Sequence, residues 1–144
     1  MSASAKIKAA RAEQWQRKSE AIVTVQLPFP ISTNRLWRPV RGRMICTARY
    51  RTWKRAAGNE INRQKLGRIK GPFNVSVVLQ RKPGKNPDAD NCLKCVLDIL
   101  QEYQVIENDN LTRAIDISWS PHQVGAHVVL TRLSDSVALR RAAA

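Results

Sequence analysis

A cluster of acids interrupts an otherwise basic sequence at a point where a strand pattern gives way to a helix pattern. The segment from Pro87 to Lys94 contains Asp88, Asp90 and an amide at Asn91. Carboxylates that converge repel one another, so such a cluster is stable where the acids are solvated, cap a helix or bind a cation. Oxygen ligands without a histidine favour Mg²⁺, with Mn²⁺ as a substitute, over Zn²⁺.

The charge of the whole chain favours a polyanionic partner. Its 144 residues include 25 lysines and arginines against 11 aspartates and glutamates, a formal net charge of +14. Twelve of the basic residues lie between Arg35 and Lys70, where Glu60 is the one acid and three aromatic residues are interleaved. Such a segment is expected to contact the phosphates of nucleic acid. The alternative is a solvated basic face that serves solubility.

The length of the chain indicates a single folded domain, and its three cysteines are expected to be reduced thiols. We expect a basic helical extension over residues 1–20, a folded domain over 21–133 and a flexible tail over 134–144. No apolar run reaches the length of a membrane span and no secretory signal is recognisable, so we expect a soluble, cytoplasmic protein without membrane contact. Cys92 and Cys95 have the spacing of a redox or zinc pair, but they lie beside an apolar stripe, which favours buried structural thiols.

Alternation of apolar and polar side chains predicts five strands. The clearest are residues 22–27 and 73–80, where every second side chain is apolar. Residues 44–47 form a further short strand. Residues 114–119 and 126–130 are interpreted as the two strands of a hairpin. The predicted fold is mixed α/β, with a small mixed β-sheet and two core helices.

Two helices complete the prediction. The first begins at about Ala48 and buries a stripe that includes Trp53, whereas the second covers about residues 89–103. A long arginine-rich loop over residues 31–43 precedes the first helix, and an ordered loop of this size usually carries function. Trp37 lies in that loop between two arginines, so it is a candidate to stack on nucleic-acid bases.

The acids around the second helix suggest phosphodiester chemistry. Lys94 lies one helical turn after Asp90, and Asp109 can supply a third carboxylate if the chain folds back after the helix. In such a site a metal ion activates water, while a lysine offsets charge on the phosphorus. The alternative is structural: Asp88 caps the helix, Asp90 complements its dipole, and Lys94 pairs with Asp98.

The motif resembles that of a known family. Pro-Asp-x-Asp-Asn-x-x-Lys from Pro87, followed by Asp98 and Val105-Ile106-Glu107-Asn108-Asp109, is similar to the signature of RusA-type Holliday junction resolvases. These are small endodeoxyribonucleases that prophages often carry. Leu27-Pro28-Phe29-Pro30 and Ser32-x-Asn34-Arg35 resemble the opening strand and loop of the family, and the likeness spans about residues 23–130.

The resemblance implies a catalytic set and a substrate. Asp88, Asp90 and Asp109 correspond to the catalytic, metal-binding carboxylates, and Lys94 corresponds to the catalytic lysine. Where relatives commonly have paired aspartates, this chain has Asn108-Asp109, so Asp109 alone takes the metal role. The implied enzyme is a Mg²⁺-dependent homodimer that binds four-way junctions and nicks two opposing strands, in recombination, repair or phage DNA processing.

The predicted DNA contacts combine the basic segment with the motif. They are Asn34, Arg35, Trp37, Arg38, Arg51, Lys54, Arg55 and Asn91. The competing hypothesis is a basic nucleic-acid-binding protein without catalysis, which would use the same surface. Both hypotheses predict binding that weakens with salt.

Overall fold

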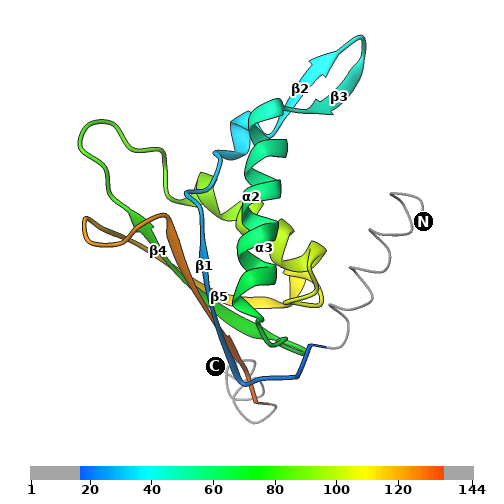
Figure 1. Ribbon diagram of the computed structural model, residues 1–144, viewed down its shortest axis with the longest axis vertical. Helices are drawn as coiled ribbons and strands as arrows, with labels where there is room; N and C mark the ends of the chain where they lie inside the picture. Colours follow the sequence, from blue (N-terminus) through cyan, green and yellow to red (C-terminus); the bar gives the residue numbers. More distant parts are fainter. Residues whose placement is uncertain (1–16, 135–144) are drawn as a thin grey trace.

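The fold is built on a four-stranded mixed sheet. The computed structural model describes residues 17–134 of the chain. The strands are β1 (Ile22–Leu27), β4 (Phe73–Gln80), β5 (Thr112–Ser120) and β6 (Ala126–Arg132), in the spatial order β1-β6-β4-β5. The β4–β5 pair is parallel and the other pairs are antiparallel. The predicted mixed α/β class is therefore confirmed (Figure 1).

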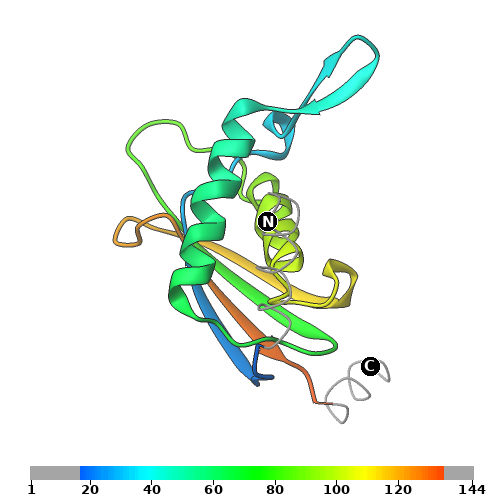
Figure 2. The same cartoon turned by 45° about the vertical axis from the view of Figure 1, so that its right-hand side comes forward.

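Both long helices cover the same face of this sheet. They are α2 (Ala48–Gln64) and α3 (Leu93–Glu102), and Figure 2 shows them side by side in front of the strands. Every second residue of β4 is buried beneath them, as the alternation predicted. The second helix is shorter than predicted, because residues 90–92 form a 3-10 turn, η2 (Asp90–Cys92), before the α-helix begins.

The pairing predicted for the last two strands is wrong. β5 and β6 do not form a hairpin, because β4 lies between them and pairs with both. β6 occupies a central position since it buries Ala126, Val128 and Leu130 completely, whereas β5 is a largely exposed edge strand. The connection between β5 and β6 crosses the end of β4, where Gln80 N donates to Gly125 O at 2.8 Å.

The loop predicted over residues 31–43 is also wrong in part. It contains a 3-10 turn, η1 (Thr33–Arg35), and β2 (Trp37–Val40), which pairs with β3 (Arg43–Cys46) in a second, two-stranded sheet. Arg41 and Gly42 join these strands with φ of 50° and 76°. A two-residue turn with both central φ angles positive matches the natural twist of a hairpin. The hairpin projects away from the sheet and helices (Figure 1).

The predicted N-terminal extension falls mainly outside the described residues, as does the predicted tail from residue 135. Residues 17–20 are not helical. The Arg17 guanidinium donates to Leu66 O at 2.9 Å and to Tyr103 O at 3.3 Å, which lie just beyond the ends of α2 and α3. A cation near the C-terminus of a helix interacts favourably with the helix dipole. Arg17 therefore links residues at the start of the folded domain to the ends of both helices. Among the helices of residues 17–134, none is long and apolar enough to cross a membrane.

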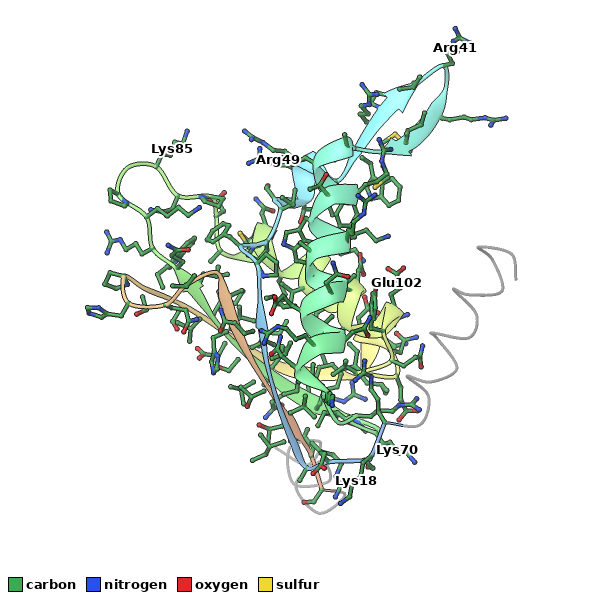
Figure 3. The ribbon with its side chains drawn as sticks, viewed as in Figure 1. Lys18, Arg41, Arg49, Lys70, Lys85 and Glu102 are labelled. Atoms are coloured by element: carbon green, nitrogen blue, oxygen red, sulfur yellow. The ribbon has the colours of Figure 1, made fainter. Side chains whose placement is uncertain are left out.

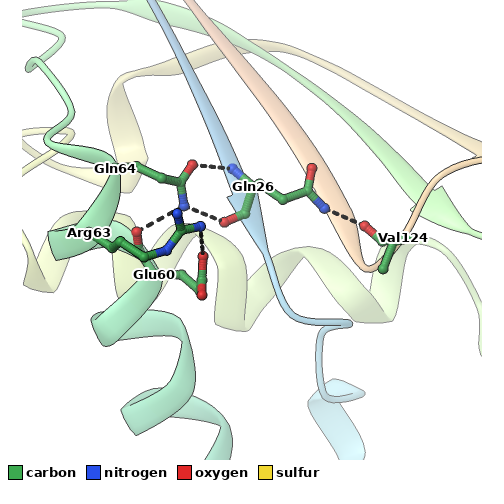
Figure 4. Close-up of polar contacts among 5 residues, drawn as sticks. All are labelled: Gln26, Glu60, Arg63, Gln64 and Val124. Carbon is green, nitrogen blue, oxygen red and sulfur yellow. Dashed lines mark hydrogen bonds and ion pairs between the residues drawn. The ribbon is translucent and has the colours of Figure 1, made fainter.

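Gln64 closes part of the free edge of β1 (Figure 4). Its Oε1 accepts from Gln26 N at 2.8 Å, and its Nε2 donates to Gln26 O at 2.8 Å and to Glu60 O at 2.9 Å. The side chain therefore binds the backbone of the edge strand as another strand would. Exposed strand edges favour pairing with other chains, so the contact also protects β1.

Replacing Gln64 by alanine should lower the free energy of unfolding by about 1–2 kcal/mol, because two half-buried backbone groups of Gln26 lose their partners. Urea unfolding measures this change. The matched control is Arg63→Ala in the same helical turn, whose exposed side chain pairs with Glu60. Equal midpoints for the two variants would contradict the role given to Gln64.

Candidate active site

The acidic motif lies where the chain passes from β4 into α3. Asp88 ends the connecting loop, Asp90 opens η2, and Lys94 stands in the first turn of α3. Two backbone hydrogen bonds tighten this passage, from Asn91 N to Asp88 O and from Cys92 N to the carbonyl of residue 89, both at 3.1 Å. The side chains of Asp88, Asp90 and Lys94 are exposed.

Asp88 and Asp90 do not act as caps. The N-cap positions of η2 and α3 are Ala89 and Cys92, and neither turn has a side-chain cap hydrogen bond. Across residues 17–134, neither carboxylate has a hydrogen bond or a salt bridge. The two charges act on the same neighbour, since burial and then the charges of Asp90 and Asp88 raise the pKa of the Cys92 thiol. Two neighbouring acids thus have no partner among the described residues of a strongly basic protein.

Lys94 joins the motif to the segment after α3. Its Nζ donates to Asp98 Oδ1 at 2.9 Å and lies 3.9 Å from Asp109 Oδ2. The hydrogen bond to Asp98, together with the charges of Asp98 and Asp109, raises the pKa of Lys94. The lysine therefore stays protonated at neutral pH. The structural alternative correctly describes the Lys94–Asp98 pair, but it does not account for Asp109.

Asp109 is held by its backbone, which leaves its carboxylate directed at Lys94. Its N–H donates to Gln101 Oε1 at 2.9 Å, and it opens the 3-10 turn η3 (Asp109–Leu111). The preceding Asn108 uses its own side chain to cap this turn, accepting from Asn110 N at 3.0 Å. Asn108 thus has a local structural task, while Asp109 presents its charge to the motif.

The acids form two groups. Asp88 and Asp90 share one neighbourhood around Cys92, whereas Asp109 lies beside Lys94 and Asp98. Over residues 17–134, no three histidine, cysteine, aspartate or glutamate side chains come together closely enough to hold a metal ion.

The predicted proline- and asparagine-containing loop packs against the motif. Thr33 Oγ1 donates to Asn91 O at 2.9 Å, and Cys95 Sγ donates to Ile31 O at 3.4 Å. Asn34 and Arg35 follow directly and are exposed. Segments that are more than fifty residues apart in the chain therefore share one surface with the acids.

The basic side chains predicted to contact DNA are exposed, with one exception. Arg51 and Arg55 are exposed on α2, and Arg38 is exposed on β2. Lys54, predicted as a DNA contact, forms a 3.4 Å salt bridge to Glu102 of α3, and its Nζ lies 5.3 Å from the centre of the Tyr50 ring. Lys54 therefore bridges the two helices.

The individual DNA contacts predicted from sequence left out three basic residues at the same end of the molecule, although Arg41 and Arg49 belong to the basic segment expected to contact phosphates. Arg41, Arg49 and Lys85 extend outward from the hairpin, α2 and the loop before the motif (Figure 3). A sequence signal did exist for Lys85, since the run from Arg81 to Lys85 leads directly into the acids.

Comparison with known proteins identifies the class. The sequence profile of the endodeoxyribonuclease RusA family matches residues 28–131. The chain therefore belongs to the RusA family of endodeoxyribonucleases. It is also 34% identical over 87 residues to a protein of Aquifex aeolicus named crossover junction endodeoxyribonuclease RusA, an alignment that covers 60% of this chain and 68% of that protein.

The cysteines next to the acids are structural. Cys95 is fully buried, and burial raises the pKa of its thiol to about 12. The pKa of Cys92 is raised as well, with burial as the main cause. Cys46, in the hairpin, is partly exposed and also unpaired. Protonated buried thiols are poor nucleophiles and poor metal ligands.

Alkylation of the native protein with iodoacetamide near pH 8 should therefore label Cys46 and spare Cys92 and Cys95. The thiolate fraction of Cys95 is roughly a thousandfold below that of an ordinary cysteine, and its burial adds a steric block. Mass spectrometry of the digested protein locates the label, and labelling after unfolding serves as control. Rapid native labelling of Cys95 would contradict the structural role.

Proposed function

We propose that this protein is a magnesium-dependent endonuclease that resolves four-way DNA junctions by paired, symmetric nicks. Family membership supplies the nuclease class. The name of the Aquifex aeolicus relative supports a crossover junction as substrate. The process served would be recombination, repair or phage DNA processing.

One observation carries the metal dependence. Asp88 and Asp90 are exposed neighbours without a hydrogen bond or salt bridge among the described residues, in a chain with a net charge of +14. A bound cation offsets the repulsion of such a pair. The available donors suit Mg²⁺, because they are carboxylates, while the nearest thiols are buried with raised pKa values.

Each residue has a distinct role in this proposal. Asp88 and Asp90 would hold Mg²⁺, which when bound activates water and stabilises the leaving oxygen. Asp109, which lies beside Lys94 and outside a three-acid cluster in residues 17–134, would have to move toward them to add a third ligand. Lys94 donates to the phosphate oxygens as negative charge develops there, and Asp98 keeps the ammonium charged and oriented. Asn91, which stands between the acids and Lys94, orients the DNA or a metal ligand.

DNA binding and dimerisation follow from the substrate. The DNA backbone around the acids is bound by the predicted contacts Asn34, Arg35, Trp37, Arg38, Arg51 and Arg55. Lys54 supports this surface through its salt bridge to Glu102 of α3. Two nicks related by a two-fold axis are most simply made by two identical sites, so the active form is a homodimer. The competing hypothesis, binding without catalysis, predicts the same salt dependence but no nicks.

Replacement of Asp90 by asparagine tests the catalytic assignment. Cleavage of a labelled four-way junction should fall by roughly 10²–10³-fold. Junction binding should be retained or strengthened, because one negative charge near the phosphates is removed. Gel assays measure cleavage with Mg²⁺ and binding with Ca²⁺.

The matched control is Asp116→Asn, the same charge change on the edge strand β5, where the carboxylate accepts from Ser76 Oγ at 3.3 Å. This variant should cleave like the parent protein. An Asp90→Asn protein that cleaves at the parent rate contradicts the proposed site.

A further inference from the structure

The β2–β3 hairpin has two chemically different faces. Cross-strand partners share a face, so Trp37 and Cys46 lie on one side together with Pro39 and Met44. The opposite side carries Arg38 paired with Ile45, and Val40 paired with Arg43. One face is therefore wholly apolar, and the other presents two arginines.

The apolar face is exposed to solvent. The Trp37 side chain is 51% exposed and the Met44 side chain is 64% exposed, although both are large and hydrophobic. Cys46 packs against the core and Trp37 touches the Tyr50 ring, but Met44 is outside the core cluster of the described residues, so packing within the domain accounts for only part of this face. Exposed apolar groups gathered on a projecting element indicate a binding surface.

The base of the hairpin is fixed, so its faces are held in a defined direction. Trp37 contacts the Tyr50 ring edge-on, with centroids 6.1 Å apart. Thr47 Oγ1 donates to Arg35 O at 2.7 Å, and the Arg51 guanidinium donates to Cys46 O at 2.8 Å. Through η1, whose Thr33 binds Asn91 O, the same framework reaches the acidic motif.

The charge around the hairpin indicates which kind of ligand this surface binds. No acid occurs between Glu20 and Glu60, whereas Arg38, Arg41 and Arg43 lie on the hairpin itself. A polyanion with exposed apolar faces matches both properties of this element. Unstacked bases in DNA have these properties, since each base offers a flat apolar face next to phosphates.

We propose that the β2–β3 hairpin is a wedge that enters the centre of branched DNA. Trp37, Pro39 and Met44 lie against bases that are unstacked at the branch point, while Arg38, Arg43 and the tip residue Arg41 contact the flanking phosphates. The substrate in this proposal, branched DNA, rests on the proposed function. The new part is that the β2–β3 hairpin opens the base stacking at the branch point. Residues 37–44 thereby distinguish branched from linear DNA.

The test uses a four-way junction with 2-aminopurine beside the branch point, because the fluorescence of this base rises when it is unstacked. Saturating parent protein, with Ca²⁺ in place of Mg²⁺, should raise the fluorescence. Met44→Ser and Trp37→Ala should abolish this rise at saturation and weaken binding by about tenfold. Met44 has no polar contact to lose, so Met44→Ser remains informative if Trp37→Ala fails to fold.

The matched control is Val124→Ala in the turn between β5 and β6, another exposed apolar residue at 73% exposure. It should give the full fluorescence rise. An undiminished rise with Met44→Ser and Trp37→Ala overturns the wedge. So does conversion of a dimer to monomers by Met44→Ser in sedimentation velocity, which would assign this face to a second copy of the chain.

The two proposals can fail separately. If the parent protein raises the fluorescence but does not cleave with Mg²⁺, the wedge stands and the nuclease assignment fails. If the parent protein cleaves the junction without any fluorescence change at the branch point, the nuclease assignment stands and the wedge is overturned.

Discussion

The parallel pairing of β4 with β5 is the constraint on which the rest of the structure depends. Parallel neighbours cannot be joined by a tight turn, so the chain must leave the sheet after β4 and return through a helix. That helix is α3, which buries Cys95, Val96 and Ile99 against the sheet. Its opposite side is left to solvent. The crossover thus places a loop, a helix start and an exposed helix face next to one another.

The residues of the proposed active site occupy these positions. Asp88 and Asp90 lie in the passage into α3, and Lys94 lies on its exposed side, where Asp109 meets it from the passage into β5. The hairpin and the loop before the motif add cationic arms at the same end of the molecule. Acids that would repel DNA elsewhere therefore lie within a surface whose overall charge attracts it.

Local patterns predicted the elements that bury one face. β1 and β4 were predicted with their observed bounds, because burial of one strand face requires an apolar side chain at every second residue. The strand predicted over residues 44–47 corresponds to β3, but β2 and its pairing with β3 were missed, because the hairpin is largely exposed and no core imposes a pattern on it. The neighbours of β5 and β6 could not be predicted either, since strand order depends on contacts between distant segments.

At the candidate site too, contacts within one helix could be predicted from the sequence, whereas contacts between distant segments could not. The Lys94–Asp98 pair follows from spacing on one helix, and the sequence predicted it as the structural alternative. The approach of Asp109 to Lys94 depends on the path of the chain after α3, so sequence could state it only as a condition. The salt bridge of Lys54 was missed because its partner, Glu102, belongs to another helix.

The most direct test compares a labelled synthetic four-way junction with a linear duplex built from the same sequence, in Mg²⁺, in Ca²⁺ and with a chelator. The account predicts paired nicks on opposing strands, in the junction alone and with Mg²⁺ alone. Tight binding to the junction without nicks in Mg²⁺, or equal cleavage of the linear duplex, would contradict it.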